Sequence, residues 1–126
     1  MEVLANANPG PIVAGNPKNI LRTHSDKLTK AISTNLYRVS ESLYAEGLIP
    51  PDTKDEVFAG ATGLNDFRKS SQLVNVLQKL LEASVNPEQY LIDICHVLTK
   101  QQHRTLTDIA TSILHWLGKC VFVHCQ

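Results

Sequence analysis

An imidazole and a carboxylate near residue 105 are the first candidates for catalysis in this chain. His103 and Asp108 flank an expected helix boundary, where the two groups could lie close together. Nucleophilic catalysis also needs a nucleophile that the base activates and a third group that orients the base. No glycine-rich loop or strained turn accompanies these two residues. We therefore expect no catalytic residues and a protein that is not an enzyme.

Near the C-terminus are three residues of types that bind soft metal ions, Cys120, His124 and Cys125. A structural zinc site needs four ligands, commonly in two closely spaced pairs, and the sequence offers no second pair. Cys95 and His96 are adjacent within an expected helix, so their side chains point in different directions. We expect no bound metal and no cofactor. A metal- or redox-sensing domain that uses the C-terminal cysteines is left open as an alternative.

His24 lies on the apolar side of an expected helix, among Leu21, Leu28 and Ile32. Each imidazole nitrogen can donate or accept a hydrogen bond, so a histidine on such a face can be satisfied within the core. We predict that His24 is half-buried and hydrogen-bonded, and that it is neither a metal ligand nor a base.

The charge of the chain is balanced overall but divided between two neighbouring segments. Of the 126 residues, 12 are Lys or Arg and 12 are Asp or Glu, so the net charge is zero. Segment 18–30 has four basic residues and one acid, whereas segment 35–59 has five acids and two basic residues. Opposite charges on one molecule permit head-to-tail contacts and steer association most strongly at low salt. The other interpretation is that these charged residues only make up the solvated faces of amphipathic helices and have no role in binding.

Several classes of protein fit the composition poorly. Nucleic-acid-binding proteins usually have a basic excess, because phosphate neutralisation provides much of their affinity. A small helical nucleic-acid-binding module that uses the basic first helix is nevertheless an alternative. No N-terminal signal sequence is visible, and no apolar stretch reaches the roughly 18–20 residues of a membrane span. The three cysteines are an odd number without the spacing of a disulfide framework, so the sequence predicts a cytoplasmic protein without membrane contact.

Apolar residues recur at helical spacing, and no alternating run is long enough to indicate a buried strand. We predict six helices and no sheet. The first two are expected at about 17–33 and 35–46, with Gly47 as a left-handed C-terminal cap. A short third helix follows Pro50-Pro51 and ends at Gly60 and Gly63. Its expected inward-facing residues are Val57, Phe58 and Ala61.

The other three helices follow similar signals. Asn65 or Asp66 caps the fourth helix, whose apolar residues run from Phe67 to Leu81. Asn86-Pro87-Glu88 begins the fifth. Thr105 and Asp108 resemble a capping box that opens the sixth, and Gly118 closes it. The expected organisation is a flexible leader (1–17), a helical domain (18–117) and a short tail (118–126).

Three stretches carry a resemblance to a known family. They are Leu21-Arg22-Thr23-His24 with Lys27-Leu28 and Ile32, Leu43-Tyr44-Ala45-Glu46-Gly47-Leu48-Ile49, and Gln72-Leu73-Val74 through Leu80-Leu81. In this order and spacing, residues 18–117 resemble the caspase recruitment domain (CARD) of the death-fold superfamily. The resemblance implies an all-α, six-helix antiparallel bundle of Greek-key type with a bent first helix. It also implies an adaptor or regulator in apoptotic or innate-immune signalling, without a catalytic centre.

The resemblance further implies binding to other death-fold domains, or self-association into oligomers or filaments, and no nucleic-acid or membrane partner. Domains of this family bring a basic surface on the first and fourth helices against an acidic surface on the second and third. The candidate basic residues are Arg22, Lys27, Lys30, Arg68 and Lys69. The candidate acidic residues are Glu41, Asp52, Asp55 and Glu56. Ser71 stands where the family often has a basic residue, which weakens the assignment on the fourth helix.

Overall fold

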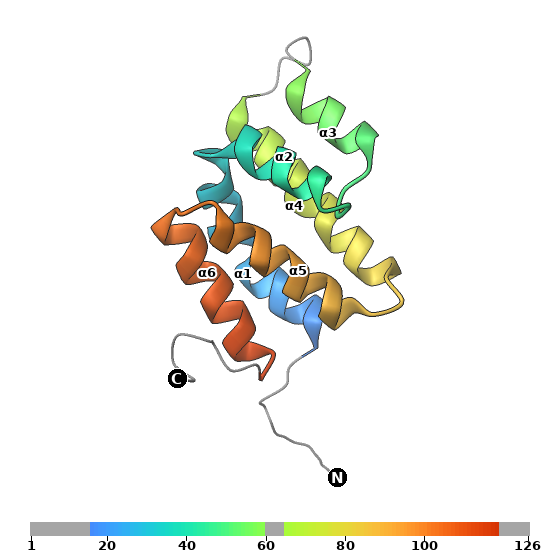
Figure 1. The fold of residues 1–126 in the computed structure, drawn as a ribbon, viewed down its shortest axis with the longest axis vertical. Helices are drawn as coiled ribbons and strands as arrows, with labels where there is room; N and C mark the ends of the chain where they lie inside the picture. Colours follow the sequence, from blue (N-terminus) through green and yellow to red (C-terminus); the bar gives the residue numbers. More distant parts are fainter. Residues whose placement is uncertain (1–15, 60–64, 119–126) are drawn as a thin grey trace.

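The computed structural model describes residues 16–59 and 65–118, and these ranges form six α-helices without a strand. In chain order the helices are α1 (Pro17–Ser33), α2 (Leu36–Ala45), α3 (Pro51–Phe58), α4 (Asp66–Ala83), α5 (Pro87–Lys100) and α6 (Arg104–Trp116). Figure 1 shows α3 at one end of the molecule, and the last turns of α6 near the start of α1 toward the other. The prediction of a six-helix, all-α chain is confirmed within these ranges.

Asparagine and proline residues set where several helices begin. The side chains of Asn16, Asn65 and Asn86 each accept a hydrogen bond from a first-turn N–H group, at 2.9, 2.8 and 3.1 Å respectively. These bonds satisfy N–H groups that have no partner inside the helix. Pro17 and Pro87 occupy first helical positions, where no N–H group is needed. The predicted starts at Asn65 and Asn86 are confirmed.

Gly47 ends α2 in the predicted left-handed conformation, with a φ of 74°. Its N–H donates to the carbonyl oxygen of Tyr44, and the N–H of Leu48 donates to that of Leu43, both at 2.9 Å. These two bonds form a Schellman motif, which satisfies the last carbonyls of the helix and requires a positive φ at the glycine. The chain then turns toward Pro50 and α3.

Two expectations about helix ends need revision. The cap of α6 is His103 rather than Thr105, because a ring nitrogen of His103 accepts the N–H of Leu106 at 3.4 Å. Thr105 lies inside the first turn of α6. The first helix, α1, runs without interruption over Pro17–Ser33, so it is not divided into two helical segments. A bend of its axis that leaves the helix continuous stays a prediction.

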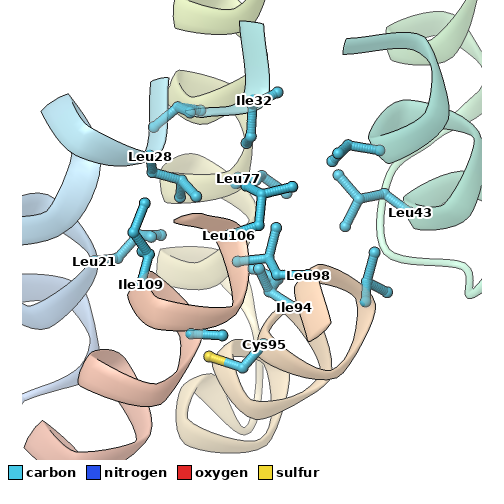
Figure 2. Packing of buried hydrophobic residues seen from close by; sticks show 14 of the residues in the cluster. Leu21, Leu28, Ile32, Leu43, Leu77, Ile94, Cys95, Leu98, Leu106 and Ile109 are labelled. Atoms are coloured by element: carbon cyan, nitrogen blue, oxygen red, sulfur yellow. The ribbon is translucent and has the colours of Figure 1, made fainter. Parts of the chain in front are cut away.

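The hydrophobic core lies between α1 and the helices that surround it. The helices α4, α5 and α6 all pack against α1, and α2 packs between α3 and α5. Figure 2 shows Leu21, Leu28 and Ile32 of α1 close to core residues of the other helices. Those labelled there are Leu43, Leu77, Ile94, Cys95, Leu98, Leu106 and Ile109, all of which are buried. Full burial of one such side chain contributes about 1.5–3 kcal/mol.

Two phenylalanines expected on inner faces lie at the surface instead. Phe58 in α3 is 43% exposed and Phe67 in α4 is 48% exposed. Val57 and Leu73 are among the buried residues of these helices. Phe58 is the last residue of α3 and Phe67 lies in the first turn of α4, where fewer neighbouring elements cover a side chain.

Some expectations fall where the structure does not describe the chain. Gly60, Ala61 and Gly63 lie there, as do nearly all of the expected leader (1–17) and tail (118–126). Among the helices that the structure describes, none is both long enough and apolar enough to cross a membrane.

Candidate functional site

The three candidate basic residues of α1 lie on its solvent-facing side. Arg22, Lys27 and Lys30 are all exposed, and we call them the basic surface. Lys30 lies 3.6 Å from Asp26, one turn earlier in the helix, and both side chains are largely exposed. An exposed pair of this kind contributes at most about 1 kcal/mol. A partner can therefore replace Asp26 at little cost in free energy, and all three cations are available to it.

The two candidate basic residues of α4 have different environments. Arg68 is exposed in the first turn. Lys69 is only 6% exposed, and its ammonium donates a hydrogen bond to the carbonyl oxygen of Ala59 at 3.0 Å. This bond ties α4 to the residue that follows α3, because Ala59 is the C-terminal cap of that helix. Lys69 therefore does not belong to an exposed basic face, and its assignment as an interface residue is corrected.

The acidic candidates lie on α2 and α3, away from the basic surface. Glu41 on α2 and Asp52, Asp55 and Glu56 on α3 are exposed, and we call these four the acidic surface. Within residues 16–59 and 65–118 none of the four forms a salt bridge. Glu46, at the C-terminal end of α2, instead forms an ion pair with Lys100 of α5 at 3.3 Å. The carboxylates of the acidic surface are thus free for contact with another molecule.

Aromatic rings beside the acidic surface were not anticipated from the sequence. Tyr37, Tyr44 and Phe58, which we call the aromatic patch, are each about 40% exposed. The rings of Tyr37 and Phe58 meet edge to face with centroids 5.1 Å apart. The ammonium of Lys54 lies 4.7 Å from the centroid of Tyr44 and 5.7 Å from that of Phe58, within the range of cation–π contacts. The seven-residue spacing of the two tyrosines, which places them on one helix face, was the available signal.

The residues weighed for acid–base chemistry have structural roles. His24 is buried; its Nδ1 lies 2.8 Å from the carbonyl oxygen of Ile20 and its Nε2 lies 2.9 Å from Ser112 Oγ. The prediction of a hydrogen-bonded histidine is confirmed, with burial deeper than expected. The ring of His103 caps α6. Burial raises the pKa of the Cys95 thiol to about 12, so the thiol is protonated and poorly nucleophilic near neutral pH.

No metal site is formed by the residues that the structure describes, since no three His, Cys, Asp or Glu side chains among them lie close enough to share an ion. Cys120, His124 and Cys125 lie outside these residues. The metal- or redox-sensing alternative therefore stays a prediction about the C-terminal tail.

Comparison with known proteins gives no family assignment. No protein-family model matches the chain. No curated protein and no solved structure is significantly similar to it. The resemblance to the CARD family therefore stays a proposal, which depends on the residues and the geometry described above.

Proposed function

We propose that this chain is a non-enzymatic interaction module of CARD type, which binds other death-fold domains or further copies of itself. It acts as an adaptor or regulator in apoptotic or innate-immune signalling in the cytoplasm. The resemblance of residues 18–117 and the presence of six short helices support this proposal. The observation that carries it is the separation of free charge between α1 and the α2–α3 region.

The two charged surfaces lie on different parts of the bundle. The helix α3 packs against α2 and α4 rather than against α1. The carboxylates of α3 therefore do not neutralise the cations of α1 within one molecule. A second copy that brings its acidic surface to this basic surface would pair charges that are otherwise exposed to solvent. Such a contact leaves one surface free on each molecule, so it can propagate into a chain of copies.

Charge supports recognition more than affinity in such a contact. Exposed ion pairs accelerate association and select the partner, but they add little stability. The aromatic patch supplies apolar area next to the acidic surface, and aromatic side chains frequently dominate the binding energy of protein interfaces. We therefore expect the α2–α3 side of the contact to combine carboxylates with the rings of Tyr37 and Phe58.

A charge-swap experiment tests this pairing. One variant carries Lys27→Glu and Lys30→Glu, and a second carries Asp52→Lys and Asp55→Lys. Each variant alone should fail to self-associate at concentrations where the wild-type chain does. An equimolar mixture should associate again, because the intact surface of each variant meets the intact surface of the other. Sedimentation velocity measures association, and electron microscopy of the same samples reveals any filaments.

The controls separate a specific contact from a general effect of charge. Lys79→Glu changes an exposed lysine on α4 outside both surfaces and should leave association unchanged. Circular dichroism should give the same helix content for all variants. Self-association that survives both reversals, or a mixture that does not recover it, would contradict the proposed contact.

A further inference from the structure

A groove with a volume of about 580 Å³ lies between α1 and α6. Pockets of about 300–1,000 Å³ are the usual size for small-molecule sites. The α1 side of the groove includes Lys27 and Lys30, and the α6 side includes Thr105 and Asp108. The groove differs from a typical surface hollow because charged and hydroxyl side chains from two helices line it.

Hydrogen-bond donors line both sides of the groove. Lys27 and Lys30 provide two ammonium groups, and Thr105 provides a hydroxyl. The Nδ1 atom of His103 accepts the N–H of Leu106, so in the neutral ring the hydrogen is on Nε2, which is left as a donor. The groove thus presents donors from two helices and from the residue that caps the second.

The charge of the lining favours an anion. Asp108 is the only carboxylate among the described residues that line the groove, against two lysines. The contact of Lys30 with Asp26 lies at the solvent-exposed surface, and such pairs are easily exchanged for a better ligand. A phosphate monoester carries about −1.5 to −2 charges near neutral pH together with three acceptor oxygens, so it can engage both ammonium groups.

Apolar side chains and a fixed wall complete the groove. Ala31 and Ile109 contribute aliphatic lining. The hydrogen bond between His24 and Ser112, both of which also line the groove, holds α1 to α6 at this point. The position of the two sides is therefore set by the fold, so that little ordering is needed when a ligand binds.

We propose that this groove binds a small organic phosphate. The phosphate lies between Lys27, Lys30 and the start of α6, and the organic part lies against Ala31 and Ile109. This binding does not depend on the proposed association between copies, although Lys27 and Lys30 belong to both sites. A neutral ligand or a cation would leave the two ammonium groups without a partner.

Calorimetric titration of the full chain with phenyl phosphate tests the proposal. Phenyl phosphate should bind more tightly than inorganic phosphate, and phenol should not bind measurably. The double variant Lys27→Gln and Lys30→Gln should weaken phenyl phosphate binding at least about tenfold, because charge-assisted hydrogen bonds are lost. Asp108→Asn should tighten binding, because it removes a like charge. Lys79→Gln, on the exposed side of α4, is the matched control and should bind as the wild type does.

Several results would overturn the site. Equal affinity of the wild type and the double lysine variant would exclude these lysines as ligands. Equal binding of phenol would show that charge is not recognised, and equal binding of inorganic phosphate would exclude a role for the organic part. Unchanged or weaker binding by Asp108→Asn would place the phosphate elsewhere. Circular dichroism of each variant confirms that it is folded.

Discussion

His24 Nε2 lies 2.9 Å from Ser112 Oγ, and this contact joins α1 to α6 beside the groove. The carbonyl oxygen of Ile20 can only accept, so the Nδ1 atom of His24 donates to it at 2.8 Å. In the neutral ring Nε2 is then an acceptor, and the hydroxyl of Ser112 donates to it. The ring of Trp116 meets the imidazole edge to face, with centroids 5.3 Å apart. The helices α1 and α6 are thus joined by a directed polar contact as well as by apolar packing.

Removal of the hydroxyl tests the contribution of this contact to stability. Ser112→Ala leaves Nε2 of His24 without its donor, and we expect the free energy of unfolding to fall by about 1 kcal/mol. His24→Ala should cost more, because it also removes the buried ring. The two changes should not be additive, since they share one interaction. Urea unfolding of both single variants and the double variant gives the coupling free energy, and an additive pair would exclude the hydrogen bond.

Lys69 should behave as a structural residue rather than as part of an interface. Lys69→Ala removes a hydrogen bond from a buried ammonium to Ala59, and we expect it to lower the free energy of unfolding by about 1.5–3 kcal/mol. The exposed neighbour Arg68 is the matched control. Arg68→Ala should change the free energy of unfolding by less than about 0.5 kcal/mol. Under conditions where it is fully folded, Lys69→Ala should leave the salt dependence of association as it is in the wild type, because no exposed cation is lost. A folded variant whose association depends less on salt would restore the interface assignment.

Local signals in the sequence account for most of the helix boundaries. Asn65, Asn86 and Gly47 act within one turn of their own position, so their residue types alone predicted where α4 and α5 begin and where α2 ends. The cap of α6 was missed because histidine is not among the residues that usually cap helices. Its imidazole acts there through a ring nitrogen, which no spacing rule identifies.

Tertiary relationships were predicted less well because periodicity does not state which neighbour covers a side chain. Phe58 and Phe67 follow the apolar pattern but lie where α3 ends and α4 begins. Lys69 follows the polar pattern but is covered where α4 meets the end of α3. The exposure of the acids on α2 and α3 could be predicted without such information, because charged residues face solvent unless they are paired.

The left-handed conformation of Gly47 predicts a specific sensitivity to substitution. A Cβ atom at this position would meet no atom beyond the two neighbouring residues within 4 Å, so the effect of Gly47→Ala comes from the local backbone conformation and not from packing. We expect it to lower the free energy of unfolding by about 1 kcal/mol, and Gly47→Asn to lower it less. Gln102 also has a positive φ, of 55°, so Gln102→Gly should be neutral or stabilising. Thermal unfolding compares the three variants, and tolerance of Gly47→Ala would argue against the Schellman motif.

A buried thiol and a half-buried phenol predict a loss of stability at high pH. Burial raises the pKa of Cys95 from its ordinary 9.0, and that of Tyr90 from its ordinary 10.0, to about 12 in each case. As the pH rises above about 9, the unfolded chain loses these protons while the folded chain keeps them, so the free energy of unfolding falls. The fall continues until the pH reaches the folded pKa values.

Denaturant unfolding at about pH 8 and about pH 10 measures this dependence. Cys95→Ala and Tyr90→Phe should each reduce the fall between the two pH values, whatever their effect on stability at the lower one. Tyr90→Phe should also destabilise the chain at the lower pH, because the hydroxyl donates to the carbonyl oxygen of Leu48 at 2.6 Å. A pH dependence that neither change alters would show that these groups are not protected in the fold.

The aromatic patch and the acidic surface should control different steps of association. Long-range attraction by carboxylates acts before contact, so Asp55→Asn should lower the association rate and its dependence on salt. Rings are buried only once the contact has formed, so Phe58→Ser and Tyr37→Ser should chiefly raise the dissociation rate. We expect each ring variant to weaken binding by about tenfold, as is typical for an aromatic anchor.

Surface plasmon resonance with immobilised Asp52→Lys/Asp55→Lys chains separates these rates. Those chains retain the basic surface, while the flowing chains carry Lys27→Gln and Lys30→Gln. The altered surface of the flowing chains is then neutral, so the charge-paired contact forms only between the intact acidic surface and the intact basic surface. Val85→Ser, at a fully exposed apolar residue between α4 and α5, is the control and should leave both rates unchanged. If Phe58→Ser altered only the association rate, the ring would lie at the rim of the contact. The carboxylates would then be the principal determinant of the contact between copies, and the aromatic patch would bind a different partner.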